Sequence, residues 1–300
     1  MTTLLGITHS RPTAKPPPRS CDCHTHVFGP VSRFPYAAGR TYTPGAASIA
    51  ELAALHDHLG IDRVVIVHPS PYGRDNRVSI DAIARLGLKR ARGVAVIDAS
   101  MSDADLRALD AGGMRGARVN LETAGVFDPA KAWDAISATA KRIAPLGWHV
   151  QTFARLSLIA ALGDHLARLP VPLVIDHFGR PDAALGVGQP GLDVLRRLVG
   201  AGKAHVKLSA SYRISTLPDH ADAAPIAEAL IAENPERMLW GTDWPHPRGA
   251  ARAPDKRDVI EPFMAIDDGA SLDRLARWAA TPERLQRILV DNPARLYRFD

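Results

Sequence analysis

Cysteine is scarce in this sequence: Cys21 and Cys23 are the only two among 300 residues. Residues two apart on a strand rarely reach disulfide geometry, and a Cys-x-Cys pair with no second pair is not a zinc site. We therefore expect both thiols to be reduced and packed, as in a cytoplasmic enzyme.

Long apolar runs are also missing. No stretch approaches the length needed to span a membrane, and the N-terminus MTTLLGITHSRPTAKPPPRS lacks the apolar core of a signal peptide. Its proline-rich end predicts an extended or disordered arm over residues 1–20. We expect a cytoplasmic protein without a membrane partner, either a monomer or a small homo-oligomer.

Charge of one sign does not dominate, because 37 Lys and Arg stand against 32 Asp and Glu, for a net charge of +5. The basic residues are scattered, which argues against a nucleic-acid partner; an arginine-lined pocket for an anionic substrate explains the excess equally well. A non-catalytic anion- or nucleic-acid-binding barrel stays open as an alternative. It would bind with steep salt dependence and show no turnover.

Motifs of several enzyme classes are absent, including the GxSxG elbow and the Walker lysine motif. GVGQPG at positions 186–191 formally matches GxGxxG. It follows a loop rather than a strand, so we reject it as a dinucleotide site.

Short apolar runs alternate with segments of helical spacing along the whole chain from position 21. The expected strands are CDCHTHV, RVVIVHPS, ARGVAVID, MRGARVNL, HVQTFA, PLVIDHFG, HVKLSASYR and RMLWGT. Eight strand–helix units favour a closed (β/α)8 TIM barrel, with residues 21–300 as a single domain. Polar residues follow several strands, where such a barrel carries its active site.

A histidine pair lies at the end of the first strand, in CDCHTHVFGP. Alternation along a strand places Asp22, His24 and His26 on one face and the cysteines on the other. Two imidazoles so close together can hold a metal, a carbonyl oxygen or a water. On the following helix, which Ser48 is expected to cap, His56 and His58 are expected to lie on the surface.

Two later strand ends supply partners for this pair. GTDWPHP places Asp243 in a loop stiffened by prolines, where it could ligate a metal or deprotonate a water, with His246 nearby. IDHFG adds His177 as a third imidazole. Arg118 and Arg213 follow two further strands, where each guanidinium could clamp a carboxylate.

Taken together, these motifs resemble the amidohydrolase superfamily. The resemblance is to the amidohydrolase-2 group, and within it to the branch of lactonases that includes the 2-pyrone-4,6-dicarboxylate lactonases. It rests on HTH, DHFGRP and WGTDWPHP, with RTYTPGAAS, GIDRVVIVHPSPYGRDN, RGARVN and VKLSASYR in the same order. It implies a barrel that hydrolyses a carboxylate-bearing lactone of the pyrone, muconolactone or sugar-acid type.

The resemblance also implies roles for individual residues. Asp243 would be the base that takes a proton from water, and three imidazoles would polarise the carbonyl. The implied polarising residues are His24, His26 and His177. The implied substrate-binding residues are Tyr42, Ser70, Arg118, Arg213, His246 and Phe153.

The sequence departs from the metal-binding members of the superfamily. Binuclear members carry a carboxylated lysine on strand 4, which here ends in Arg118 and Asn120. Mononuclear members carry a histidine at the end of strand 5, where His149 lies too early. The lactonase branch implies no cofactor. The alternatives left open are one zinc on His24, His26, His177 and Asp243, and a zinc-dependent decarboxylase or hydratase on the same barrel.

Overall fold

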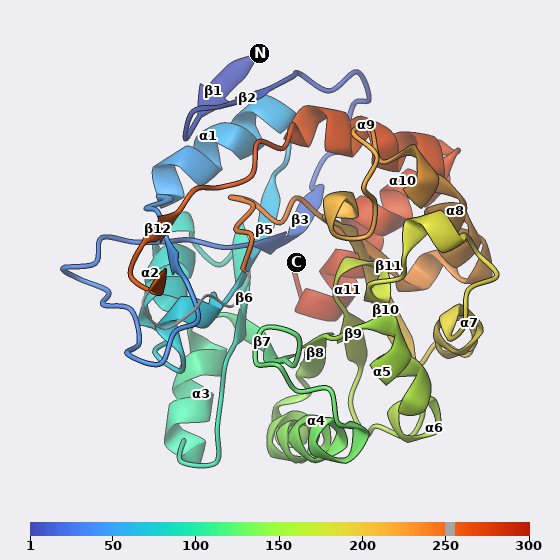
Figure 1. Ribbon diagram of the computed structural model, residues 1–300. Coiled ribbons are helices and arrows are strands. Elements are labelled where there is room, and N and C mark those ends of the chain that lie inside the picture. Colours follow the sequence, from blue (N-terminus) through green and yellow to red (C-terminus); the bar gives the residue numbers. More distant parts are fainter. Residues whose placement is uncertain (250–255) are drawn as a thin grey trace.

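A parallel sheet of eight strands forms the centre of the computed structural model, which describes residues 1–249 and 256–300 (Figure 1). Its strands are β3 (Cys21–Thr25), β5 (Arg63–Val67), β6 (Ala91–Ala95), β7 (Met114–Asn120), β8 (His149–Phe153), β9 (Leu173–Ile175), β10 (Ala204–Ser209) and β11 (Met238–Gly241). They are hydrogen-bonded in chain order, so each neighbour is the next strand of the barrel. The predicted (β/α)8 architecture is confirmed.

The barrel closes between its first and last strands. Asp243 N donates to His24 O at 2.8 Å, and His26 N donates to Trp244 O at 2.8 Å. Gly241 allows this approach, because a Cβ there would lie 2.6 Å from His24 N. The closure brings the two motifs expected to carry the chemistry side by side.

Helices surround the barrel, as Figure 1 shows. They are α1 (Ile49–Leu59), α2 (Arg77–Leu86), α3 (Asp103–Ala111), α4 (Pro129–Ile143), α5 (Leu156–Ala161), α6 (Gly163–Leu166), α7 (Leu192–Gly200), α8 (Ala224–Glu233), α9 (Asp268–Ala279), α10 (Pro282–Gln286) and α11 (Asn292–Tyr297). Strands such as β5, with all five residues buried, pack between these helices and the barrel interior. Within the described residues, no helix has the length and apolar character needed to cross a membrane.

Two smaller sheets lie outside the barrel. The chain begins with a hairpin of β1 (Thr2–Leu4) and β2 (Ile7–His9), within the segment expected as an extended arm. Strand β4 (Thr43–Pro44) pairs in parallel with β12 (Ile260–Glu261), which ties the long loop after β3 to the segment after β11.

The first strand departs from the predicted alternation. Its pairing with β5 shifts register between Asp22 and Thr25. Cys21 and Cys23 pack in the barrel interior, whereas Asp22 lies 3.3 Å from Nε2 of His56 on α1. The expectation of a surface position for His56 is therefore wrong, because this buried carboxylate recruits the imidazole as a partner.

Candidate active site

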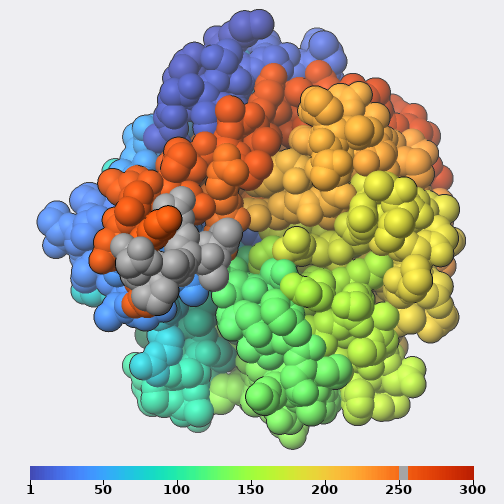
Figure 2. Space-filling model, viewed as in Figure 1, coloured from blue at the N-terminus to red at the C-terminus, as the bar shows by residue number. Residues whose placement is uncertain are grey.

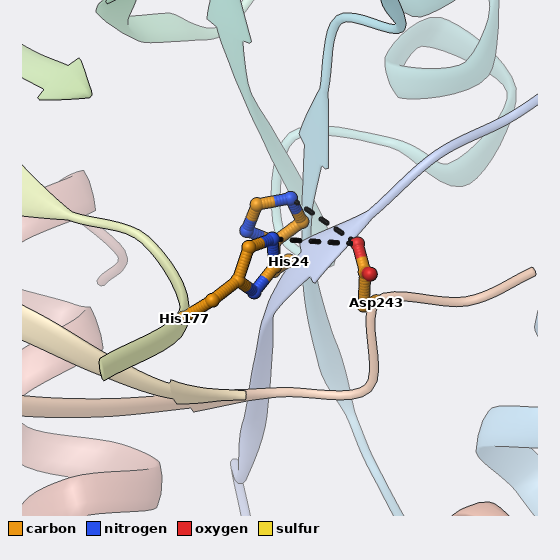
Figure 3. Close-up of side chains that lie close together, drawn as sticks. All are labelled: His24, His177 and Asp243. Atoms are coloured by element: carbon orange, nitrogen blue, oxygen red, sulfur yellow. Dashed lines mark ion pairs between the residues drawn. The ribbon is translucent and has the colours of Figure 1, made fainter. Parts of the chain in front are cut away.

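Four side chains converge where β3, β9 and β11 end. Asp243 Oδ1 lies 3.5 Å from Nε2 of both His24 and His26, and 3.9 Å from Nε2 of His177. Figure 3 shows His24 and His177 turning ring nitrogens toward this carboxylate. All four side chains are buried, so the structure brings together the residues that the sequence placed on separate strand ends.

The backbone at these positions is in the left-handed region. Asp243 has φ of 68°, His246 of 67° and His177 of 51°. Non-glycine residues rarely adopt such angles, and they persist where surrounding contacts hold them in place. Here Trp244 N donates to Thr242 Oγ1 at 3.0 Å, and Thr242 Oγ1 donates to Asp22 Oδ2 at 2.6 Å.

The second oxygen of Asp243 is fully occupied. Oδ2 accepts from Tyr212 Oη at 2.6 Å and from Arg213 Nε and Nη2 at 3.0 and 2.8 Å. Arg213 therefore lies against the carboxylate of the protein itself, whereas the sequence suggested a clamp for a substrate carboxylate. Only Oδ1 of Asp243 is directed at the three imidazoles.

These contacts determine the charge of the site. Burial alone would raise the pKa of Asp243, but Arg213, His177 and the other imidazoles hold it well below its usual range. Burial lowers the pKa of His24 to about 3 and that of His177 well below its usual value. The site at neutral pH thus combines an ionised carboxylate with two neutral imidazoles.

A network of buried polar side chains contacts the Nδ1 side of the His24 ring. Its Nδ1 lies 3.3 Å from Asp176 Oδ1 and 3.4 Å from Lys207 Nζ. Asp176 Oδ2 also accepts from Gln151 Nε2 at 3.1 Å and lies 3.5 Å from Arg118. Burial would raise the pKa of Asp176, but His24 and Lys207 hold it well below its usual range, so this carboxylate is also ionised.

The donor set also fits a single metal ion. His24 Nε2 and Asp243 Oδ1 are buried without a hydrogen-bond partner, and His24, His177 and Asp243 form a possible metal site. In a tetrahedral zinc site with Zn–N of about 2.0–2.1 Å, ligand atoms lie roughly 3.3 Å apart, close to the spacing around Asp243 Oδ1. The same atoms fit a bound water or a carbonyl oxygen.

A small chamber, here called the inner chamber, lies above these groups. It has a volume of about 30 Å³ and is lined by His26, Tyr42, Ser70, Arg118, Asn120, Thr123, Phe153, His177, Arg213, Asp243, Pro247, Arg248 and Gly249. Roughly 10–15 Å³ suffices for one water, so it has room for one or two. The predicted substrate-binding residues, except His246, therefore share one chamber with Asp243.

Two larger cavities adjoin the inner chamber. The outer cavity, of about 500 Å³, shares Phe153, Arg213 and Arg248 with it and adds Arg180 and Glu122. The second, of about 320 Å³, is lined by Arg40, Arg74, Arg118, Ser70 and Asn120, among others. In Figure 2 the molecular face is hollowed near its centre. The volumes of these cavities suit a small molecule, and the arginines that line them suit an anionic one.

His246 differs from the prediction. Its side chain is fully buried, its Nε2 lies 3.0 Å from Asp268 Oδ2, and it does not line the inner chamber. Tyr212, in contrast, was not identified from the sequence. Strand alternation would direct Tyr212 and Arg213 to opposite faces, but a 3₁₀ turn at Ser211–Arg213 directs both to Asp243.

Comparison with known proteins places this geometry in a family. Residues 21–299 match the model of a family described as Amidohydrolase. A 2-pyrone-4,6-dicarboxylate hydrolase of Comamonas testosteroni is 40% identical over 96% of this chain and 93% of its own. A 4-sulfomuconolactone hydrolase of Rhizobium radiobacter is 36% identical over 94% and 90%.

A solved structure gives the same result for the fold. The crystal structure of an Agrobacterium tumefaciens protein superposes with a TM-score of 0.81 at 25% identity, covering 96% of this chain and 99% of that one. The convergent histidines, the aspartate after the last strand and the match across nearly the whole barrel agree, and the chain belongs to the amidohydrolase family.

Proposed function

We propose that this protein hydrolyses the ring ester of a small lactone that carries an acidic group. One observation carries the proposal: a single ionised oxygen, Asp243 Oδ1, faces three imidazoles beside a water-sized chamber. The pyrone dicarboxylate and sulfomuconolactone hydrolases named above support a lactone of the kind formed in aromatic degradation.

In the proposed reaction Asp243 acts as the general base. Its Oδ1 takes a proton as the water oxygen attacks the lactone carbonyl carbon. The neutral imidazoles of His24 and His177 donate N–H groups to the developing oxyanion, which they stabilise more strongly than the ground-state carbonyl. Collapse breaks the ring C–O bond, and the leaving oxygen takes up the proton, which gives an open-chain acid.

Other residues are proposed to hold the substrate and keep the base ionised. Arg118 lines both the inner chamber and the adjoining cavity, where its guanidinium suits a carboxylate. Arg213 and Tyr212 bind the far oxygen of Asp243 and leave Oδ1 free. Phe153 provides an apolar wall for the ring.

We further propose that the reaction proceeds without a resident metal. Near the site, Arg118, Lys207 and Arg213 already outnumber the carboxylates Asp176 and Asp243. A divalent cation would add two positive charges to this excess. If zinc does bind, His24, His177 and Asp243 would hold it with His26 beside them, and it would lower the pKa of a bound water.

The second candidate function is a zinc-dependent decarboxylase or hydratase, which the fit of the donor set to one metal favours. Metal analysis of the purified protein, combined with a panel of anionic lactones assayed with and without chelator, separates the two. Lactone opening that persists after chelation, with far less than one metal per chain, is the expected result. One zinc per chain, chelator-sensitive release of carbon dioxide and no lactone opening would overturn the proposal.

A further inference from the structure

A second buried cluster connects the start of the chain to the loop that carries Asp243. It consists of His9 at the end of β2, His246 after β11 and Asp268, the first residue of α9, all fully buried. Asp268 Oδ2 lies 3.0 Å from His246 Nε2 and 3.3 Å from His9 Nδ1. The proposed reaction assigns none of these three residues a chemical step.

The N-terminal segment is held firmly against α9, beside which it lies in Figure 1. Ser10 N donates to Asp267 Oδ1 at 2.9 Å, and Ala14 N donates to Asp273 Oδ1 at 2.8 Å. A Cβ on Gly269 would lie 2.0 Å from Ser10 O, so the two backbones touch. The segment is therefore part of the packed structure around the start of α9.

On the other side of the cluster, His246 is joined to Asp243. His246 N donates to Asp243 O at 2.8 Å, and Met264 N donates to His246 O at 3.0 Å. Both Asp243 and His246 have positive φ, a conformation that local preference opposes and that outside contacts must hold. The side chain of His246, anchored on Asp268, supplies such a contact next to the proposed base.

We propose that Asp268 and His9 are positioning residues, through which the N-terminal segment fixes the Asp243 loop (residues 242–247) in its reactive geometry. This positioning role rests on the proposed function in one respect, namely that Asp243 is the general base. Hydrogen bonding in a buried site is directional, and loss of the anchor would let Asp243 Oδ1 move relative to the three imidazoles.

The test compares Asp268→Leu with the near-isosteric Asp268→Asn, whose amide oxygen still accepts from His246. We expect Asp268→Leu to lower kcat on the best lactone about 10–100-fold with KM little changed, since a displacement of ~1 Å can cost on the order of 10²-fold. We expect Asp268→Asn to restore most of the kcat. His9→Phe, which keeps the Asp268–His246 contact, should show a smaller loss in the same direction.

Amide hydrogen exchange provides a readout that does not depend on activity. Exchange over residues 242–247 should accelerate in Asp268→Leu and not in Leu230→Ala, a core variant on α8 that serves as the control for general destabilisation. Unchanged loop exchange, or a raised KM with unaltered kcat, would overturn the positioning role. If the wild type opens no lactone but the loop still loosens, the proposed function fails and the positioning role stands.

Discussion

Arg213→Gln is the substitution that most directly separates the charge of the base from its position. Arg213 donates two hydrogen bonds to Asp243 Oδ2, at 2.8 and 3.0 Å, and is the largest of the favourable charges on that carboxylate. Burial raises the pKa of Asp243 and the guanidinium lowers it, so without the guanidinium the effect of burial should raise the pKa. A neighbouring arginine typically lowers a carboxyl pKa by about 1–3 units, so the pKa of Asp243 should rise by a similar amount.

The expected effect appears in the pH dependence of kcat/KM, which reports the free enzyme. Asp243 acts as a base only when ionised, so activity is lost as pH falls through its pKa. The wild type should keep its base ionised down to the acid limit of its stability, because that pKa lies well below the usual range. In Arg213→Gln the pKa of Asp243 should rise by about 1–3 units, so activity should be lost at a higher pH than in the wild type.

Arg213→Lys is the matched control, because it keeps the positive charge and loses the two-pronged contact. It should lower kcat/KM with a smaller shift of the acid limb. Identical acid limbs in the wild type and Arg213→Gln would refute the idea that this guanidinium keeps the base ionised. A change confined to KM would instead assign Arg213 to substrate binding alone.

Three further outcomes are expected from other contacts. Tyr212→Phe removes the 2.6 Å hydrogen bond to Asp243 and should lower kcat about tenfold with little change in KM, measured by steady-state kinetics. Lys207→Met removes the fully buried ammonium group that lies 3.5 Å from Asp176 Oδ1, and should lower the free energy of unfolding by about 3 kcal/mol in urea titrations. A loss below about 1 kcal/mol would contradict this. Burial lowers the pKa of His149 from 6.5 to about 3, so the unfolded state binds its proton first as pH falls. This group should therefore destabilise the fold by about 1.4 kcal/mol per pH unit between pH 6.5 and about 3, a slope that His149→Leu should reduce in urea titrations.

Much of the fold could be predicted because its signals are local. Ser48 was expected to cap the first helix, and its side chain accepts from the backbone N–H of Glu51 in the first turn of α1. The strands ending at Asn120 and Phe153 were also found from their apolar runs. Caps and strand runs depend on neighbours in sequence, which the sequence displays directly.

The contacts that define the site depend on irregular backbone and distant partners. The register shift in β3 and the 3₁₀ turn at Ser211–Arg213 break the alternation on which face assignments rest. His246 was predicted to bind substrate, but its side chain pairs with Asp268, which lies 22 residues further along and displays no local signal. Strand ends identify which residues meet, whereas tertiary packing decides which of their atoms face each other.

Turnover by Asp243→Asn tests the account most directly, with Asp164→Asn on the surface of α6 as a matched control and metal content measured for each protein. On the best anionic lactone, loss of a general base should lower kcat about 10²–10⁴-fold while the ligand still binds. Asp164→Asn should match the wild type. Turnover of Asp243→Asn within a few-fold of the wild type would contradict the claim that this carboxylate activates the attacking water.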